Sequence, residues 1–229
     1  MKIEFLNAWQ GKLIEPIARH LEQQQSGIDV FCFQEASDQL QRVCEEVFPD
    51  YTKVTAKKRV SGDLYFQQAT YIHPAIELQD TSTILGKGEV GGFGLAVTLK
   101  SNTETPVHIL NLHGVSEPGD KLDSLERVQQ SQVIIDFFRQ KRGPRVIGGD
   151  FNMLPDARSM LMFGEEGYQD LIKDFGVRTT RNRLARERYP ERKQDFADYV
   201  FVRDIDVVDF SVPQIEISDH LPMIVDVRN

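Results

Sequence analysis

The sequence predicts an α/β fold, because strand-like and helical segments alternate along the chain. Four strand-like segments consist mostly of apolar residues, and each of them is followed directly by polar residues. Near-continuous apolar runs of this kind are typical of strands that are covered on both faces of a sheet. No linker, repeat or low-complexity tract interrupts the alternation, so we expect one domain. The four segments are residues 3–6, 28–33, 107–112 and 146–149.

Three helical patterns separate these strands. In each pattern, apolar residues recur every three or four positions, as on the buried face of a helix. Pro16 is acceptable in the first turn of the first helix, and Ser37 is a suitable N-cap for the second. The third pattern is the longest. The patterns cover residues 13–25, 37–47 and 120–142.

The middle of the chain, residues 64–100, is strand-like and contains a glycine motif. Residues 86–91 fit the dinucleotide-binding pattern G-x-G-x-x-G. Such a site needs a following helix whose N-terminus faces the pyrophosphate, whereas strand-like sequence follows here at residues 93–99. We therefore interpret the motif as a tight turn between two strands. After Asn152 the sequence becomes irregular and then basic before strands return.

The composition is that of a globular protein. The 229 residues are 40% hydrophobic and 27% charged, and no apolar run approaches the length of a membrane span. Glu4 lies where a signal peptide would be apolar, so we expect no signal peptide. Cys32 and Cys44 lack metal-binding spacing and are expected to be reduced core residues. We predict a cytoplasmic monomer.

The charge distribution is uneven. The net charge of −8 argues against a general nucleic-acid coat, although a cluster of acids that binds a cation is compatible with a nuclease. Residues 178–193 contain seven basic and two acidic residues, a net +5 that leaves −13 for the remainder. One interpretation is a solvated helix face, with Glu187 and Glu191 paired to arginines. The other is a phosphate-gripping loop, in which Arg178, Arg181, Arg183 and Arg186 bind substrate.

Two clusters of polar residues suggest chemistry. Asp150 and Asn152 stand two residues apart after an apolar run, so an extended chain would point both the same way. Asp219 and His220 follow the apolar segment 215–217, which we expect to be a strand that delivers both residues together. The two clusters suggest metal-assisted hydrolysis of phosphate esters. Either cluster alone could equally be a set of turn residues that closes a strand.

Further polar residues at strand ends complete a family pattern. In chain order, the pattern resembles that of the endonuclease/exonuclease/phosphatase superfamily, which has the DNase I-like fold, and the resemblance covers residues 3–227. Its most specific pieces are Gly-Asp-Phe-Asn and Ser-Asp-His. The resemblance implies a four-layer α/β sandwich with two mixed β-sheets packed face to face and helices outside, forming one catalytic domain over residues 1–229. The positions that carry it are Asn7, Glu35, His113, Asp150, Asn152, Asp198, Asp219 and His220.

The resemblance also implies a metal site. Glu35 and Asp219 would be direct ligands, and Asn7 would complete the set. Ligands that are rich in oxygen favour hard cations, so we expect Mg²⁺ or Mn²⁺ rather than Zn²⁺. The cation would neutralise charge on the phosphate and lower the pKa of bound water.

The remaining positions would act on the phosphate itself. Asp150 would position or deprotonate the attacking water, and Asn152 would hydrogen-bond a phosphate oxygen. His220 would pair with Asp198, which would fix the tautomer of the ring and favour its protonated form. The imidazolium would then stabilise the transition state, or the pair would act as a base. His113 would donate to the phosphate or to the leaving oxygen. Asp195 is a rival for the role of Asp198.

We therefore predict a divalent-metal-dependent phosphodiesterase or nuclease, with a phosphate ester, nucleic acid included, as its partner. The alternative within the enzyme class is a phosphomonoesterase or a small-molecule phosphodiesterase that acts on a lipid or an inositol phosphate. A non-catalytic phosphate-binding scaffold is the alternative outside that class. His20, His73 and His108 do not belong to a comparable cluster of polar residues and are interpreted as surface or core residues.

Overall fold

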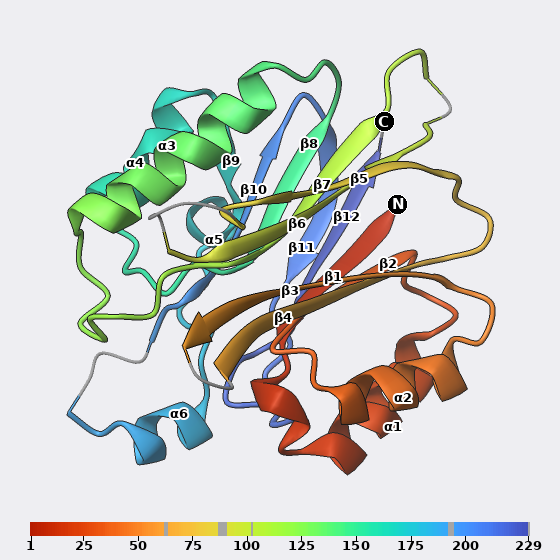
Figure 1. Ribbon diagram of the computed structural model, residues 1–229, viewed down its shortest axis with the longest axis horizontal. Coiled ribbons are helices and arrows are strands. Elements are labelled where there is room, and N and C mark those ends of the chain that lie inside the picture. The colour runs from red at the N-terminus through yellow and green to blue at the C-terminus, as the bar shows by residue number, and fades with distance from the viewer. Residues whose placement is uncertain (62–63, 87–90, 102, 192–194, 229) are drawn as a thin grey trace.

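The computed structural model describes residues 1–61, 64–86, 91–101, 103–191 and 195–228, which form two six-stranded β-sheets (Figure 1). The strand order is β11-β12-β1-β2-β4-β3 in the first sheet and β5-β6-β7-β8-β10-β9 in the second. Both sheets are mixed, because β1 runs parallel to β2 and β7 runs parallel to β8. The strands are β1 (Lys2–Asn7), β2 (Val30–Gln34), β3 (Thr52–Ser61), β4 (Leu64–Ile72), β5 (Leu78–Ile84), β6 (Phe93–Leu99), β7 (Val107–His113), β8 (Arg145–Asp150), β9 (Gln169–Asp170), β10 (Asp198–Arg203), β11 (Asp206–Ser211) and β12 (Met223–Arg228).

Helices cover the outer faces of both sheets, which confirms the predicted α/β sandwich. Figure 1 shows α1 and α2 outside the first sheet and α3 and α4 outside the second. The short helix α6 lies apart from these layers, at one end of the sheets. The helices are η1 (Trp9–Gly11), α1 (Ile14–Gln24), α2 (Asp38–Val47), α3 (Leu125–Arg139), α4 (Arg158–Glu165), α5 (Leu171–Asp174) and α6 (Arg183–Arg188).

Strand β1 shows why its sequence is apolar on both faces. Ile3 and Phe5 belong to the core between the two sheets. Leu6 belongs to a second core, which lies beneath α1 and α2. Glu4 also lies on the helix side, where its buried carboxylate contacts Nε2 of His20 at 2.8 Å. The strand is therefore covered by the second sheet on one face and by helices on the other, as its composition predicted.

Two close contacts fix how the sheets meet. A Cβ atom on Gly148 would lie 2.6–2.7 Å from three ring atoms of the fully buried Phe5, so the ring occupies the space that a side chain would need. Nearby, the buried amide of Gln34 donates to the Oδ1 atom of Asn111 at 2.7 Å. Asn111 in turn donates to the backbone oxygen of Phe33 at 3.1 Å. These bonds join β2 to β7 across the sandwich and lock the relative position of the sheets.

Side-chain caps set where two helices begin. The Ser37 hydroxyl accepts from the backbone N–H of Leu40, as expected for the predicted N-cap. Helix α3 is shorter than the predicted 120–142, because Ser124 caps it by accepting from the N–H of Arg127. The fully buried guanidinium of Arg127 holds the preceding residues in a loop, since it donates to the backbone oxygens of Pro118 and Leu122.

The structure differs from the sequence prediction at residues 215–217, at β3 and at α4. Residues 215–217 do not form the expected strand but belong to the loop between β11 and β12. Ile217 is buried in the core beneath α1 and α2, so its alternating pattern reflects packing rather than strand pairing. Strand β3 and helix α4 were not anticipated. The interpretation of residues 86–91 as a turn depends on residues 87–90, which lie outside the described residues, although β5 and β6 on either side pair antiparallel.

Cys32 and Cys44 are buried and free, as predicted. No helix within the described ranges is both long enough and apolar enough to cross a membrane.

Candidate active site

The two sheets deliver polar residues to one shared edge. Asn7 ends β1 and Glu35 follows β2, and these two strands of the first sheet are parallel. His113 ends β7 and Asp150 ends β8, which are the parallel pair of the second sheet and place these two residues side by side in register. Asp198 begins the antiparallel strand β10 and pairs with Asp150. Parallel neighbours end at the same edge of a sheet, so the topology itself brings these residues together.

Asp150 lies at the centre of the arrangement. Its Oδ2 atom accepts from the Nδ2 of Asn7 at 2.9 Å, and its Oδ1 atom accepts from the backbone N–H of Asn152 at 2.9 Å. The same oxygen, Oδ2, faces two imidazoles, with the Nε2 of His113 at 3.8 Å and the Nε2 of His220 at 3.7 Å. The carboxylate is buried and held in one orientation. It is therefore placed to accept a proton from a group that enters between the two rings.

Asn7 also links the metal candidate Glu35 to this centre. Its Nδ2 atom lies 3.4 Å from Oε1 of Glu35, while its Oδ1 atom accepts from the backbone N–H of Trp9. Burial raises the pKa of Glu35, and the Asp150 and Asp219 carboxylates raise it further, while His113 and the bond from Asn7 act in the opposite direction. Several carboxylates that share a buried site repel one another, and a bound cation relieves that repulsion.

His220 and Asp198 form a buried pair. The Nδ1 atom of His220 lies 2.8 Å and 2.9 Å from the two carboxylate oxygens of Asp198. The rival Asp195 does not contact the ring. Its carboxylate is largely exposed and lies 3.8 Å from a guanidinium nitrogen of Arg186. Of the two candidates, the structure places Asp198 against His220.

A guanidinium on the other side of the ring changes the expected charge of His220. Arg181 is buried, and its Nη1 lies 2.7 Å from the Nε2 of His220. A guanidinium can only donate, so Nε2 must accept and the proton of the ring must lie on Nδ1, facing Asp198. Burial lowers the pKa of His220 and Arg181 lowers it further. Burial and Arg181 thus oppose the protonated ring that Asp198 was expected to favour, while the contact with Asp198 fixes the tautomer.

Arg181 also holds Asp219. Its Nη2 donates to Oδ2 of Asp219 at 2.8 Å, and both side chains are about 5% exposed. The loop that carries Asp219 is fixed to the first sheet, because the Ser218 hydroxyl donates to the backbone oxygen of Asn7 at 2.7 Å. Asn182 donates to the backbone oxygen of Ser218 at 2.6 Å and so ties the segment of Arg181 to the same loop. This loop, rather than a strand, positions Asp219 and His220.

The other arginines proposed to bind substrate lie elsewhere. Arg183 forms ion pairs with Glu187 at 2.6 Å and with Glu216 at 3.0 Å. Arg186 is also exposed and lies near Asp195, and Arg178 lines a different surface hollow beside Phe175. For Arg183 and Arg186 the structure thus favours the interpretation of a solvated helix face. Arg192 and Lys193 of the basic segment lie outside the described residues.

A polar pocket of about 250 Å³ opens beside these residues. The lining residues that sequence reasoning did not select as site residues include Trp9, Lys121 and Arg188. The Nζ of the buried Lys121 donates to the backbone oxygen of Phe196 at 2.7 Å, and burial, with a contribution from Arg181, lowers its pKa to about 8. A basic residue in a loop gives no local sign of burial. The lining residues are Trp9, Gln10, Lys12, Glu35, His113, Ser116, Glu117, Gly119, Lys121, Asp150, Asn152, Arg181, Arg188, Tyr189, Asp219 and His220.

Backbone strain is concentrated around this pocket. Five of its residues have a positive φ without being glycine, a conformation that costs about 1–3 kcal/mol for each residue. Strain of this kind persists only where surrounding contacts enforce it, and it clusters at functional sites. The five residues are Trp9 (φ 49°), Gln10 (φ 56°), Glu35 (φ 51°), Lys121 (φ 59°) and Asn152 (φ 56°).

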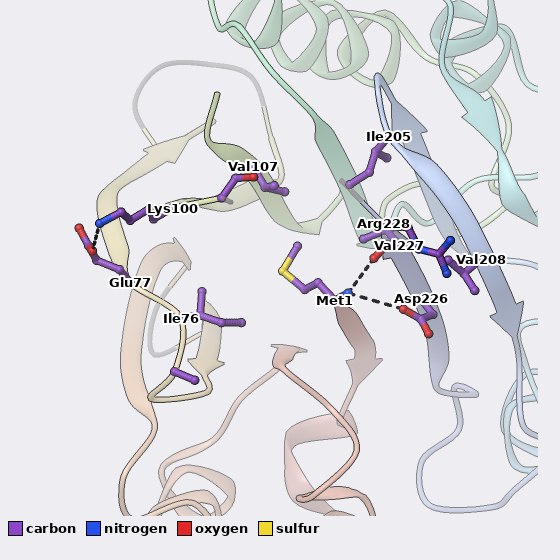
Figure 2. A pocket seen from close by; sticks show the side chains of 12 residues that line it. Met1, Ile76, Glu77, Lys100, Val107, Ile205, Val208, Asp226, Val227 and Arg228 are labelled. Atoms are coloured by element: carbon purple, nitrogen blue, oxygen red, sulfur yellow. Dashed lines mark hydrogen bonds and ion pairs between the residues drawn. The ribbon is translucent and has the colours of Figure 1, made fainter. Parts of the chain in front are cut away.

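A larger cavity of about 630 Å³ lies at the opposite edge of the sheets and lacks comparable chemistry (Figure 2). It is lined by Met1, which directly precedes β1, and by Val107 at the start of β7. Figure 2 shows two pairs among its charged groups, with the N-terminal amine near Asp226 and Lys100 bonded to Glu77. The polar pocket is therefore the better candidate for an active site despite its smaller volume.

The residues around the polar pocket fit a divalent cation. Carboxylate oxygens of Glu35, Asp150 and Asp219 line it, and oxygen ligands suit a hard ion. Asp150, Asp198 and His220 offer ligand atoms within 4.8 Å of one another and could also hold an ion. Among the described residues, this is the group of three that meets that distance, although both oxygens of Asp198 already contact His220.

Comparisons with known proteins agree with this geometry. The chain matches the Endonuclease/Exonuclease/phosphatase family over residues 6–220, which is nearly its full length. The chain belongs to this family. The match covers the second sheet and all of the first except β12 and the start of β1, and it includes every site position named above. A search of curated protein sequences finds no match.

Solved structures share the fold of this family at low sequence identity. A functionally unknown conserved protein from Enterococcus faecalis has a TM-score of 0.77 and 18% identity, with 100% of this chain and 99% of that chain covered. The human Nocturnin catalytic domain, solved with a bound sulfate anion, has a TM-score of 0.74, 14% identity and coverage of 100% and 94%. A mannosyl-6-phosphatase from Bacteroides thetaiotaomicron has a TM-score of 0.74, 18% identity and coverage of 100% of both chains.

Proposed function

We propose that this protein is a divalent-metal-dependent hydrolase of phosphate esters that acts as a phosphodiesterase or nuclease. The setting of Asp150 is the main support. Its carboxylate is fixed by Asn7 and by the N–H of Asn152, and it faces two imidazoles beside a polar pocket. The residues come from both sheets, which supports treating residues 1–229 as one catalytic unit. Family members hydrolyse phosphate esters, and such a pocket suits that reaction.

Glu35 and Asp219 would hold the metal ion, which we propose to be Mg²⁺ or Mn²⁺. Asn7 is a less direct candidate, because its amide nitrogen faces the carboxylates and its oxygen is bonded to the N–H of Trp9. When bound, the ion would neutralise charge on the phosphate and lower the pKa of a bound water molecule. A cation bound between these carboxylates would relieve their mutual repulsion, and this relief favours binding of the ion.

Side chains of the protein would carry out proton transfer and bind the phosphate oxygens. Asp150 would orient the attacking water and take its proton. Asn152 and His113 would donate to phosphate oxygens without adding negative charge. His220, kept neutral and fixed by Asp198, would hold Arg181 in place through its Nε2 atom. Arg181 lies beside it and would supply the positive charge that a protonated imidazole would otherwise bring to the transition state.

A phosphomonoesterase is the second candidate, and the cations around the pocket favour it. Lys121, Arg181 and Arg188 line a pocket of about 250 Å³, and a monoester carries more negative charge than a diester. One structural neighbour, the mannosyl-6-phosphatase, is named for such an activity, although its likeness to this chain is one of fold. The two candidates require the same residues and differ in the substrate they accept.

A matched panel of substrates and variants tests the proposal. Bis(p-nitrophenyl) phosphate, p-nitrophenyl phosphate, single-stranded DNA and RNA would be assayed in chelator and then with added Mg²⁺ or Mn²⁺. We expect no turnover in chelator, restored turnover with metal, and a loss of about 10²–10⁴-fold for Asp150→Asn. Glu35→Gln should raise the metal concentration that is needed, whereas Glu77→Gln, at an exposed ion pair, should not. Full activity in excess chelator would contradict the proposal.

A further inference from the structure

An aromatic and cationic group forms one wall of the polar pocket, beyond the residues assigned to hydrolysis. Trp9 and Lys12 come from the segment that follows β1, whereas Arg188 and Tyr189 come from the end of α6. The Nζ of Lys12 lies 4.4 Å from the centre of the Trp9 ring, and the Cζ of Arg188 lies 5.2 Å from it. All four residues line the same pocket as Glu35 and Asp219.

Lys12 and Arg188 differ from three arginines of the basic segment 178–193 in their contacts. Arg181, Arg183 and Arg186 each face a carboxylate. Within the part of the chain that the structure describes, no carboxylate lies at ion-pair distance from Lys12 or Arg188. Their recorded partners are aromatic rings and, for Arg188, the hydroxyl of Tyr189.

The bonding of Arg188 leaves its anion-binding face available. Its Nε donates to the Tyr189 hydroxyl at 2.8 Å, so the guanidinium is oriented while its two terminal nitrogens keep their donors for another group. The rings of Trp9 and Tyr189 are only partly buried, and contact between a cation and such a ring is weak, so it does not compete with a phosphate. A planar guanidinium that is already oriented binds a phosphate through two parallel hydrogen bonds.

We propose that Trp9, Lys12, Arg188 and Tyr189 form a subsite for a second, non-scissile phosphate of the substrate. This inference rests on the proposed function, because it takes the scissile phosphate to lie at Asp150. The rings give the subsite a place for a base to stack, and cations interleaved with aromatic residues are the arrangement that binds single-stranded nucleic acid. The neighbouring phosphate of a single-stranded oligonucleotide therefore fits it better than a bisphosphorylated small molecule does.

A binding measurement tests the subsite without any turnover. Trp9 is the single tryptophan of the chain, so its fluorescence reports on this group directly. The full chain in chelator would be titrated with octathymidylate, inorganic pyrophosphate and inositol bisphosphate. We expect a saturable fluorescence change with octathymidylate that weakens as salt is added, because the contacts are electrostatic. Tighter binding of the bisphosphate than of the oligonucleotide would overturn the choice of ligand, and no response to any probe would overturn the subsite.

Variants identify the cations responsible. Lys12→Ala and Arg188→Ala should each weaken binding about tenfold, as expected for the loss of one charge-assisted contact. Arg183→Ala is the matched control, since Arg183 lies in the same helix but is paired with Glu187 and Glu216. Equal weakening in Arg183→Ala would show a general charge effect and would contradict the inference.

A kinetic comparison shows whether the second phosphate aids hydrolysis. Two octathymidylates would be compared, one with phosphates throughout and one with alternate neutral methylphosphonates, so that each cleavable linkage lacks a charged neighbour. The unmodified protein should prefer the charged oligomer by about tenfold in kcat/KM, mainly through KM, and Arg188→Ala should lose that preference. On bis(p-nitrophenyl) phosphate, Arg188→Ala should lose less activity than on the charged oligomer, and Arg183→Ala, outside the pocket, should leave that activity unchanged. Equal losses on all three substrates would indicate a structural role and refute the subsite. Oligonucleotide binding without turnover of any ester would refute the proposed hydrolase function while the subsite stands.

Discussion

Gly148→Ala would place a methyl group where the Phe5 ring now lies. The added Cβ would approach three ring atoms of Phe5 to 2.6–2.7 Å, well inside ordinary contact distance, and the ring is fully buried between the sheets. Overpacking of this kind costs about 1–3 kcal/mol. Removing a glycine from a strand recovers about 0.5–1 kcal/mol by restricting the unfolded chain. We therefore expect a net loss of about 1–2 kcal/mol in the free energy of unfolding.

The same substitution should disturb the active site. Gly148 stands two residues before Asp150 on β8, and Phe5 stands two residues before Asn7 on β1. Relief of the clash would move the two strands apart, and the bond of 2.9 Å between Asn7 and Asp150 joins those strands. Since a misplacement of about 1 Å in a catalytic group can lower turnover about 10²-fold, activity should fall more than stability alone explains.

Urea denaturation followed by circular dichroism measures the stability change, and hydrolysis of bis(p-nitrophenyl) phosphate measures the effect on the site. Gly164→Ala is the control. That residue lies in α4, a Cβ there would meet no atom within 4 Å, and the change should stabilise the protein by about 0.5–1 kcal/mol. Phe5→Leu should partly rescue Gly148→Ala. A stable, fully active Gly148→Ala protein would refute the reasoning, as would destabilisation that Phe5→Leu does not relieve.

Three further predictions concern other sites. Arg127→Met should lower the free energy of unfolding by about 3–5 kcal/mol, because buried carbonyl groups lose a charged donor; urea denaturation measures it, and Arg127→Lys should cost less. Burial lowers the pKa of His108 below 6.5, so the unfolded chain binds the proton more readily, and stability should decline as pH falls below that value. Thermal unfolding across pH 5–7 should show a shallower slope for His108→Gln. Asp198→Asn should lower kcat about 10²–10⁴-fold in the diester assay while the protein stays folded.

The sequence allowed the strand-borne half of the site to be predicted. Asn7, Glu35, His113 and Asp150 each follow an apolar run, and a buried strand that stops at a polar residue is a local signal. The parallel pairing of the strands then brings such ends to one edge, which the fold confirms. Ser37 was predictable for the same reason, because an N-cap depends on residues three positions apart.

The half of the site that lies on loops depends on contacts between distant residues. Segment 215–217 alternates like a strand, but it belongs to no strand of the described residues, and Ile217 packs beneath helices instead. The sequence around Arg181 does not indicate that this residue is buried. Its ion-pair partner, Asp219, lies 38 residues away in the chain. Lys121 gives no local sign of burial either. Trp9 had a local signal that the prediction did not use, because it lies two residues after the polar strand end at Asn7.

The bond between Gln34 and Asn111 has a consequence for following the folding of this protein. Each sheet carries only part of the site, and this buried pair joins the strand before Glu35 to the strand that ends at His113. A refolding intermediate with both sheets formed but not yet docked would have native-like secondary structure and no intact active site. Recovery of turnover should therefore lag behind recovery of the circular dichroism signal, and the delay between them would time the docking of the two halves of the sandwich.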